Sequence, residues 1–529
     1  MNNDVTHEIP FCEASCFLFP TSELEIKNLL RLCKGKPLQL DEVQPKILYL
    51  VADIVAPVLA HIFNLCMSCG VYPDSLKRAR VIPIFKSGDP HNVCNYRPIS
   101  TLPFLNKIFE KILHSRLTNF FNKFSIISDD QFGFRKGTNT TMAIFYLVLD
   151  LLKTYHSKEY CVALFLDLQK AFDCVNHQVL LGKLNRYGIR GTFLALIQSY
   201  LTNREQFVAL NEFNSTLRPI NIGVPQGSVL GPLFFNIFIN DIASSFNVNC
   251  KLFADDAVFY VSRSSYDEAC DNISELSLNL SRWLLANKLV AHTDKTKLML
   301  FTPRPVSVLR EITFNGTILQ WVDEFRYLGL ILDNKISFNK HINLVCQGLS
   351  KAHGVLRALS KVLPFPSLKT LFYALSLSKL SSTLVIWGGV PFNRKKRVIT
   401  LLNKSLRSML RVRYDENNIP LTCTSELYRK SEILKLDDMY RFQLLKFMNR
   451  ALYHDERLFK SAFAPLVPQH SHNTRGVRFN LPPVRLEIEK SGTVFNCVKY
   501  FNELPDEFKH DCSKMFLKIK FRDFTLNQY

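Results

Sequence analysis

The sequence has no tandem repeat, no low-complexity segment and no signal peptide. Its 14 cysteines follow no regular spacing, so we expect reduced thiols in an intracellular protein of the nucleus and cytoplasm rather than a disulfide framework. Cys66 and Cys69, with His91 and Cys94 further on, could be imagined as a zinc site. The first two cysteines fall in an apolar helical stretch, however, which favours core residues over metal ligands.

Acidic residues are the scarcer charge, since 46 Asp and Glu face 66 Lys and Arg, giving a net charge of +20. This balance predicts a polyanionic partner. Because the basic residues are spread along the chain, nucleic acid is favoured over an anionic membrane surface. A hydrophobic content of 47% over 529 residues is typical of a folded globular protein of two to four domains.

No long apolar run is free of polar groups. Residues 46–72 are apolar enough to suggest a membrane span, but Asp53, Pro57, His61 and Asn64 interrupt the run. We therefore predict a buried helix there and expect no membrane partner.

The most informative feature is a pair of adjacent aspartates, Asp255 and Asp256, inside the otherwise apolar stretch 251–261. Neighbouring strand residues point to opposite faces, so two neighbouring carboxylates converge most easily at a tight hairpin turn. Burying two like charges is costly unless something cationic lies between them. A divalent metal ion bound by oxygen ligands is the usual solution, so the pair indicates part of a metal site.

A third carboxylate lies upstream at the end of another apolar run. Residues 161–166 predict a strand buried on both faces, and Asp167 follows it. From that position Asp167 can face a second hairpin in the same sheet. Three such carboxylates can hold two Mg²⁺ ions about 3.5–4 Å apart, the arrangement used for in-line phosphoryl transfer.

A glycine-rich segment, 223–232, leads directly into the apolar residues 233–239. Two glycines and a proline indicate an unusual turn, and glycine lets a backbone approach a substrate closely. A helix starting at about Ser228 would offer free backbone N–H groups to an anion, and beside three aspartates that anion would be a nucleotide phosphate. The alternative is an ordinary loop between a strand and a helix.

Strand-like segments interleave with long helices through the middle of the chain, which indicates an α/β or α+β unit. A helix is predicted over 267–287, and after about residue 335 the pattern is mostly helical and basic. The predicted strands are 80–85, 161–167, 206–210, 250–253, 257–262, 298–301 and 326–332.

Three segments, in this order and spacing, resemble the A, B and C motifs of reverse transcriptases. They are FLDLQKAFD at 165–173, GVPQGSVLGP at 223–232 and FADD at 253–256. The wider similarity, over roughly residues 60–529, is to the enzymes of non-LTR (LINE-type) retrotransposons of the jockey-like group. It rests on finger-like motifs at 79–89, 95–100 and 131–135, palm-like motifs at 287–289, 294–296 and 327–329, and tail motifs at 472–475 and 502–505.

The resemblance implies a role for each matching position. Asp167, Asp255 and Asp256 would be the catalytic residues and hold two Mg²⁺ ions, with Mn²⁺ as an alternative, and the backbone carbonyl of Leu168 would help. One ion would activate the primer 3′-OH and the other would neutralise the triphosphate and the pyrophosphate leaving group.

The remaining matched positions would bind the nucleotide. Lys86 and Arg97 would grip the incoming triphosphate through charge-assisted hydrogen bonds. Lys295 matches a palm lysine that would protonate pyrophosphate, although a solvated lysine remains the alternative.

Three further positions would shape the nucleotide pocket. Phe172 matches the steric gate that crowds a ribose 2′-OH and so favours deoxynucleotides, with a core aromatic as the alternative. Gln226 and Gly227 would line the nucleotide and template pocket.

The implied fold is α+β: a right-hand polymerase with fingers, an antiparallel-sheet palm with helices on one face, a helical thumb and a mainly helical C-terminal region. The expected divisions are an N-terminal extension over 1–60, fingers and palm over 61–332, a thumb or connection over 333–460 and a C-terminal region over 461–529. The oligomeric state stays open.

The implied function is RNA-directed DNA polymerase, with an RNA template, a DNA primer or target and dNTPs as partners. Two other functions stay open: a catalytically silent RNA-binding remnant, and an RNA-dependent RNA polymerase, against which Phe172 and the PQGS turn argue. Such elements normally begin with an apurinic-type endonuclease domain, which the first 60 residues are too short to contain. We therefore expect a polymerase fragment, truncated or starting from a downstream Met.

Overall fold

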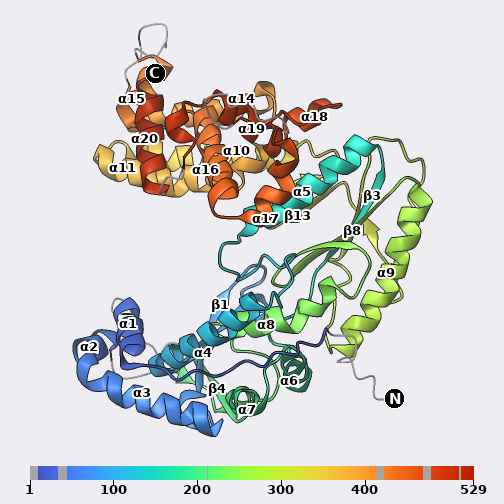
Figure 1. Ribbon diagram of the computed structural model, residues 1–529. Helices are drawn as coiled ribbons and strands as arrows, with labels where there is room; N and C mark the ends of the chain where they lie inside the picture. Colours follow the sequence, from blue (N-terminus) through green and yellow to red (C-terminus); the bar gives the residue numbers. More distant parts are fainter. Residues whose placement is uncertain are drawn as a thin grey trace.

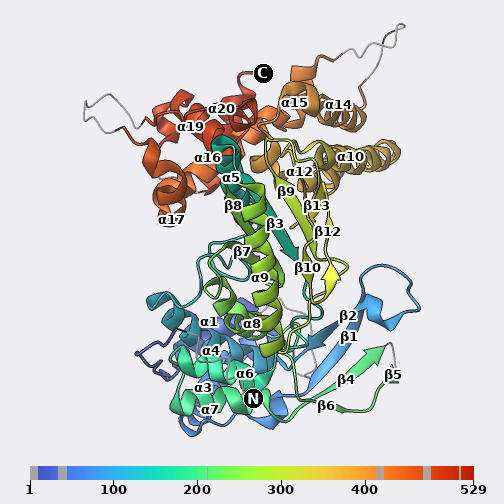
Figure 2. The ribbon, with the colours of Figure 1, turned by 90° about the vertical axis from the view of Figure 1, so that its right-hand side faces the viewer.

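The computed structural model describes residues 10–33, 44–210, 213–412, 415, 422–468, 478–510 and 514–529. The tail motif at 472–475 lies outside these residues. Within them, the N-terminal helices gather at one end and the C-terminal helices at the other, and a central sheet lies between the two groups (Figures 1 and 2).

The central sheet has five strands in the order β12-β9-β3-β8-β7. Its neighbours pair antiparallel, except for β12 and β9, which run parallel. The predicted strands of this region are confirmed to within a residue at each end. The strands are β3 (Tyr160–Leu166), β7 (Asn249–Phe253), β8 (Asp256–Arg263), β9 (Lys297–Phe301) and β12 (Gln320–Trp321).

Both faces of the central sheet are covered. Val162 and Leu164 of β3 pack into the core that includes α9 (Tyr266–Ala286), whereas Ala163 and Phe165 pack into the core that includes α5 (Thr140–Ser157). The expectation of helices on one face only is therefore wrong. The reason lies in β3 itself, because a strand that is apolar at every position must bury both of its faces.

A second sheet lies near the N-terminal helices, in the order β2-β1-β4-β5 with β6 on β4 (Figure 2). β1 and β2 form an antiparallel hairpin, and β1 also pairs in parallel with β4. The predicted strands at 80–85 and 206–210 are confirmed as β1 and β4. The strands are β1 (Ala79–Phe85), β2 (Tyr96–Thr101), β4 (Arg204–Leu210), β5 (Phe213–Asn214) and β6 (Arg218–Ile220).

The segment 326–332 is not the single strand that its pattern predicts. It folds as a hairpin of β13 (Glu324–Tyr327) and β14 (Leu330–Asp333). The turn between them has positive φ at Leu328 and Gly329, 47° and 89°. Glycine adopts this conformation without strain, so Gly329 breaks the run into two strands. A smaller hairpin, β10 (Thr313–Phe314) with β11 (Thr317–Ile318), precedes it.

The N-terminal helices are α1 (Glu23–Cys33), α2 (Pro45–Leu50), α3 (Ala52–Cys69), α4 (Phe104–Lys123), α6 (His177–Arg186), α7 (Gly191–Leu201) and α8 (Gly231–Ile239). By length and composition α3 alone, among the described residues, is apolar enough to cross a membrane, and 28% of it is buried. Leu59 and Phe63 on one face are buried, but Ile54 and Val58 on the other are 74% and 56% exposed. The prediction of a buried helix thus holds for one face only.

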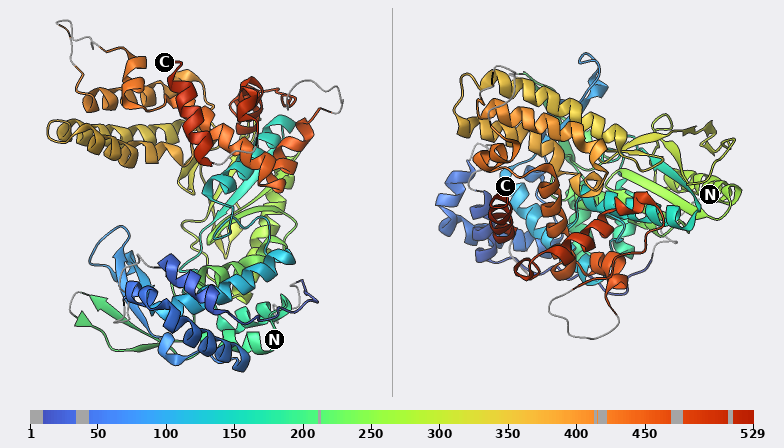
Figure 3. Two further views of the ribbon diagram at one scale, coloured as in Figure 1. Left: turned by 60° about the vertical axis from the view of Figure 1, so that its left-hand side comes forward. Right: turned by 90° about the horizontal axis from the view of Figure 1, so that it is seen from above.

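Beyond β14 the described chain is helical, as predicted. Its long helices α10 and α14 pack along each other, and α16 packs on α19 (Figures 1 and 3). The helices are α10 (Asn339–Leu359), α11 (Phe365–Phe372), α12 (Ser378–Ser381), α13 (Leu384–Trp387), α14 (Phe392–Met409), α15 (Thr424–Ser431), α16 (Leu436–Tyr453), α17 (Glu456–Leu458), α18 (Glu487–Lys490), α19 (Thr493–Glu503) and α20 (Lys514–Leu526). A π-helical turn, η6 (Phe459–Phe463), continues α17.

The C-terminal helices share a hydrophobic core with the outer face of α5. Phe145 of α5 and Phe447 of α16 meet edge to face, with ring centroids 4.7 Å apart. The C-terminal region is therefore packed onto the element that covers one face of the central sheet.

Candidate active site

The three predicted carboxylates lie at one end of the central sheet. Asp255 occupies the tight turn between β7 and β8, after Ala254 with its φ of 56°, and Asp256 opens β8 opposite Phe253. In the next pair of strands Leu166 is opposite Ala257. One further step along this antiparallel ladder sets Asp167 beside Asp256.

The charges at this edge disturb one another. Burial is the main reason why the pKa of Asp256 is raised to about 6, and the negative charges of Asp255 and Asp167 add to the effect. Burial and the Asp167 carboxylate also raise the pKa of Asp255, while the positive charges of Arg97 and Lys86 act in the opposite direction. Both aspartate side chains of the turn nevertheless remain accessible to solvent. A cation could therefore reach the carboxylates and relieve their repulsion.

The chemistry of these side chains fits a hard divalent cation, because carboxylate oxygens are its preferred ligands. Across the described part of the chain, no three acidic, histidine or cysteine side chains are already gathered at ligand distance. Instead, the Nζ of Lys295 lies 3.6 Å from Oδ2 of Asp167. The three aspartates thus form an open edge whose side chains must turn towards a shared ion, not a closed cage.

A pocket of about 420 Å³ opens beside Asp167 and Asp256, on the side of β9 and β13, and Asp294 and Lys295 line it as well. The backbone places Lys295 there. The amide of His292 donates to the carbonyl of Asp167 at 2.8 Å, and the amide of Lys295 donates to the carbonyl of His292 at 3.0 Å. The lysine therefore stays next to the first carboxylate because its loop is anchored on that residue's own backbone.

Leu168 pairs with Ala291 in an antiparallel bridge. The hydrogen bonds on either side belong to its neighbours: the amide of Gln169 donates to Val290, and the carbonyl of Asp167 accepts from His292. In such a non-hydrogen-bonded pair the central carbonyl points away from the partner strand. The Leu168 carbonyl accordingly points away from this loop.

The glycine-rich loop is clamped between β2 and the segment that follows Asp167. The amide of Ser100 donates to the carbonyl of Gln226 at 2.7 Å, and Nε2 of Gln226 donates to Oδ1 of Asp173 at 2.8 Å. Gly227 has a φ of 121°, and a Cβ there would lie 2.5 Å from the carbonyl oxygen of Ser100. Glycine is required here both by conformation and by space.

The helix after this loop begins at Gly231, three residues later than expected, and two amides at its start already have acceptors within the protein. Oε2 of Glu110, from α4, already accepts a hydrogen bond from the amide of Val229 at 2.6 Å. The hydroxyl of Ser228 accepts one from the amide of Gly231 at 2.9 Å. A buried carboxylate of the protein therefore takes the place that a helix start offers to an anion.

Phe172 is half-buried and packed on two sides. Its ring stacks on Phe235, with centroids 4.6 Å apart, and meets Phe134 edge to face at 6.1 Å. Its carbonyl accepts a hydrogen bond from the amide of Val224 in the glycine-rich loop at 2.9 Å. The ring is thus fixed beside that loop, but its packing alone fits a core aromatic as well as a gate.

Lys86 and Arg97 belong to the other sheet. Arg97 lies on β2 opposite Ile84, and the amide of Lys86, just after β1, donates to the carbonyl of Asn95 at 2.9 Å. Both side chains are exposed. They act on the carboxylates through their charge across the space between the two sheets.

Two positioning residues carried no predicted role, although both lie in the motif at 131–135. Oε1 of Gln131 accepts hydrogen bonds from the amides of Ala254 (3.1 Å) and Gly133 (2.8 Å), and Gln131 is 1% exposed. A Cβ on Gly133 would lie 2.3 Å from the Ala254 nitrogen. The motif therefore supports the turn that carries Asp255, and a Gln–x–Gly pattern before an apolar helix was its signal in the sequence.

Three carboxylates at the end of a sheet, with a tight glycine loop on one side and a basic hairpin across from them, fit a site for phosphoryl transfer. The comparison with protein families agrees with this geometry. Residues 85–332 match the family "Reverse transcriptase (RNA-dependent DNA polymerase)".

Several curated relatives are similar over a longer stretch. The probable RNA-directed DNA polymerase from transposon BS of Drosophila melanogaster is 28% identical over 74% of this chain and 45% of its own length. The RNA-directed DNA polymerase from mobile element jockey of the same species is 32% identical over 61% and 36%. The probable polymerase from transposon X-element is 30% identical over 74% and 44%. The chain thus spans less than half of each of these relatives.

These matches confirm the predicted family: the chain carries a reverse transcriptase domain related to those of jockey-like non-LTR retrotransposons. Among solved structures, apo telomerase from Candida tropicalis superposes with a TM-score of 0.36 at 12% identity, over 50% of this chain and 54% of that chain. A likeness this distant adds nothing to the assignment.

Proposed function

We propose that this chain is an RNA-directed DNA polymerase, which adds dNTPs to a primer 3′-OH on an RNA template. One observation carries the proposal: within the reverse transcriptase domain, the register of β3, β7 and β8 brings Asp167, Asp255 and Asp256 to one accessible edge. Carboxylates from the end of β3 and from the turn between β7 and β8 have no structural need to meet there, and burial together with the charges of Asp255 and Asp167 raises the pKa of Asp256 to about 6.

We assign Asp167, Asp255 and Asp256 as the ligands of two Mg²⁺ ions, with Mn²⁺ as a substitute. When bound, the two ions supply Lewis-acid activation of the primer hydroxyl and neutralise the charge on the leaving group. The direction of the Leu168 carbonyl, away from the 290–292 loop, fits a supporting ligand. Lys295, 3.6 Å from Asp167, can hold its proton near the leaving pyrophosphate.

The incoming triphosphate is proposed to lie between the two sheets. Arg97 and Lys86 approach it from the hairpin of β1 and β2, and their positive charge already reaches Asp255. The loop at Gln226 and Gly227 forms the adjoining wall, because its backbone is fixed on Ser100 of the same hairpin. Phe172, held beside that loop, is placed to exclude a 2′-hydroxyl and so favours deoxynucleotides over ribonucleotides.

We assign the larger regions of the chain by their position in the sequence. Residues 1–60 would be an N-terminal extension, 61–332 fingers and palm, 333–460 a thumb and 461–529 a C-terminal region. On α14, Arg394, Arg397 and Lys404 follow a spacing of three and seven residues, which places them on one helix face. That exposed basic face is proposed to follow the phosphate backbone of the template and primer.

Primer extension tests the proposal. Purified protein is given a DNA primer on an RNA template, Mg²⁺ and dNTPs, and is compared with the variant Asp255→Ala/Asp256→Ala and with Asp271→Ala, an exposed aspartate of α9. We expect incorporation by the wild type and by Asp271→Ala, and none by the double variant. An inactive wild type that still binds RNA would indicate a silent remnant, and a preference for NTPs would indicate an RNA polymerase.

A further inference from the structure

The turn that carries Asp255 is supported by a segment outside the hairpin, residues 128–133. This segment runs along β7: the amide of Leu252 donates to the carbonyl of Asp130, and the amide of Phe132 donates to the carbonyl of Leu252, each at 2.8 Å. The next side chain, Gln131, accepts the hydrogen bond of the Ala254 amide. A displacement of this segment therefore displaces the turn.

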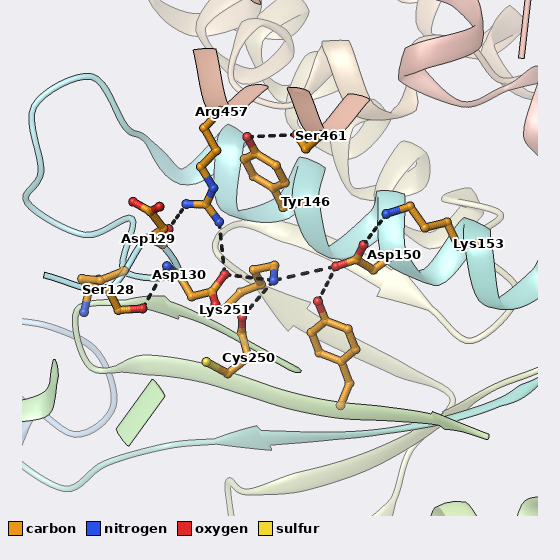
Figure 4. Close-up of polar contacts among 12 residues, drawn as sticks. Ser128, Asp129, Asp130, Tyr146, Asp150, Lys153, Cys250, Lys251, Arg457 and Ser461 are labelled. Atoms are coloured by element: carbon orange, nitrogen blue, oxygen red, sulfur yellow. Dashed lines mark hydrogen bonds and ion pairs between the residues drawn. The ribbon is translucent and has the colours of Figure 1, made fainter. Parts of the chain in front are cut away.

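A buried lysine and two carboxylates tie the same segment to the sheet and to α5. The Nζ of Lys251, on β7, lies 3.1 Å from Oδ1 of Asp130 and 3.7 Å from Oδ2 of Asp150. The hydroxyl of Tyr260, on β8, donates to Oδ2 of Asp150 at 2.6 Å. Figure 4 shows these groups as one connected set, in which β7, α5 and the segment 128–133 meet.

One cation from the C-terminal region joins this set. The guanidinium of Arg457, on α17, lies 3.2 Å from Oδ1 of Asp130 and donates a hydrogen bond to the carbonyl of Asp129 (Figure 4). It also covers the rings of Tyr146 and Phe132, with centroids 4.8 and 5.4 Å away. Asp130 is therefore shared between Lys251 from the sheet and Arg457 from the C-terminal helices.

We propose that Arg457 is a positioning residue, through which the C-terminal region holds the carboxylate turn in place. The guanidinium fixes Asp129 and Asp130, and the segment they belong to carries Gln131 to the amide of Ala254. This role rests on the proposed polymerase function. It makes the C-terminal region part of the catalytic unit, although Arg457 itself does not reach Asp167, Asp255 or Asp256.

Arginine suits this position for a geometric reason. Its planar fork can donate to a carboxylate and a carbonyl at once and can also stack on aromatic rings, whereas a lysine offers one point charge. When the Arg457 guanidinium is removed, the segment 128–133 is still held by a hydrogen bond, because Nη1 of Arg135 donates to the carbonyl of Ser128 at 2.5 Å. A variant at 457 should therefore fold, with a looser segment.

The test uses the full chain with Arg457→Gln, Arg457→Lys and the control Lys460→Gln. Lys460 lies three residues further on, is exposed and pairs with Glu456 at 2.6 Å. Hydrogen exchange of the amides of Leu252 and Ala254 is measured together with dNTP incorporation. For Arg457→Gln we expect exchange there about tenfold faster and kcat about tenfold to a hundredfold lower, with KM for dNTP changed less than about threefold.

The lysine variant is expected to lie between wild type and glutamine, and Lys460→Gln to match the wild type in both measurements. Unchanged exchange at Leu252 and Ala254 in folded Arg457→Gln would overturn the proposal, whatever happens to activity. If Arg457→Gln does not fold, Arg457→Lys decides in its place, since it keeps the charge but loses the planar fork that reaches both Asp129 and Asp130: faster exchange at the turn supports the proposal and unchanged exchange overturns it.

The two proposals can fail separately. A wild-type protein without dNTP incorporation would refute the polymerase function, but the exchange measurement would still report whether Arg457 holds the turn. Normal incorporation by wild type, with Arg457→Gln raising only KM for the template and primer, would instead show a nucleic-acid contact and refute the positioning role.

Discussion

Oε2 of Glu110 accepts a 2.6 Å hydrogen bond from the amide of Val229, so that a fully buried carboxylate closes the start of α8 directly behind the glycine-rich loop. Its other oxygen accepts a 2.6 Å hydrogen bond from the hydroxyl of Tyr200. The loop at Gln226 and Gly227 thus rests on a polar contact inside the core, and its shape depends on a residue that no substrate touches.

Replacing Glu110 should be costly for stability. Glu110→Ala leaves the Val229 amide and the Tyr200 hydroxyl buried without their acceptor, and we expect a loss of about 2–4 kcal/mol in the free energy of unfolding. Glu110→Gln keeps an acceptor of similar shape and should lose less than about 1.5 kcal/mol. Urea unfolding measures both values, and equal losses in the two variants would contradict the role of the hydrogen bonds.

The same carboxyl predicts a pH dependence. Burial raises the pKa of Glu110 above its ordinary value. Between the unfolded-state and folded-state pKa values the folded state therefore holds a proton that the unfolded state has released, and the stabilising contribution, complete below about pH 4, is lost as the pH rises through the folded-state pKa. Glu110→Gln should flatten this part of the stability profile.

Asp256 gives a second pH prediction, for the protein without metal. Burial and the neighbouring carboxylates raise its pKa to about 6, against about 3.9 for an unfolded aspartate. Its stabilising contribution is therefore complete below about pH 4 and is lost as the pH rises through about 6. With EDTA present, the Tm of wild type relative to Asp256→Asn should fall between about pH 4 and pH 6 and level off above that. A constant difference in Tm would show that the pKa of Asp256 is not raised in the folded state.

How far the sequence could predict this site depends on how local each interaction is. Asp167 ends an uninterrupted apolar run and Asp255 with Asp256 interrupts another, so strand pattern alone placed all three at strand ends. Glu110 could not be found in this way. It lies in the middle of α4, and its partner Val229 is more than a hundred residues further along the chain.

The fold was likewise predictable from the sequence only in part. The β3 pattern predicted burial on both faces, and helices cover both, although the family resemblance implied helices on one face only. The exposed face of α3 was missed because Ile54 and Val58 are as apolar as the buried Leu59. Apolar periodicity cannot separate two faces that are both apolar.

Phe172 offers a test of nucleotide choice. Phe172→Val removes the ring from beside the glycine-rich loop, and we expect the ratio of kcat/KM for dNTP over that for the matching rNTP to fall by about tenfold or more, chiefly because rNTP use rises. The variant also loses its stacking on Phe235, so its Tm should drop. Phe134→Ala, which trims the exposed edge-on neighbour, serves as the control. A loss of activity that is equal for both nucleotides would make Phe172 a core aromatic only.

The basic face of α14 predicts how binding depends on salt. Removing one cation that neutralises a phosphate should reduce the slope of log K against log salt by about 0.9 for a duplex. Arg397→Gln/Lys404→Gln removes two exposed charges that lie seven residues apart on one helix face. The slope measured with a primer–template should therefore fall by up to about 2, and affinity should drop to a similar extent for unrelated sequences.

Lys395 provides the matched control from the same basic run. Its Nζ lies 2.5 Å from Oδ1 of Asp437 and donates to the carbonyl of Gly388 at 3.2 Å, and its side chain is 11% exposed. Lys395→Gln should therefore lower the free energy of unfolding by about 1–3 kcal/mol and leave the salt slope unchanged. If Lys395→Gln reduces the slope as much as Arg397→Gln/Lys404→Gln does, the nucleic acid does not follow the exposed face of α14, because net charge alone would then explain the salt dependence.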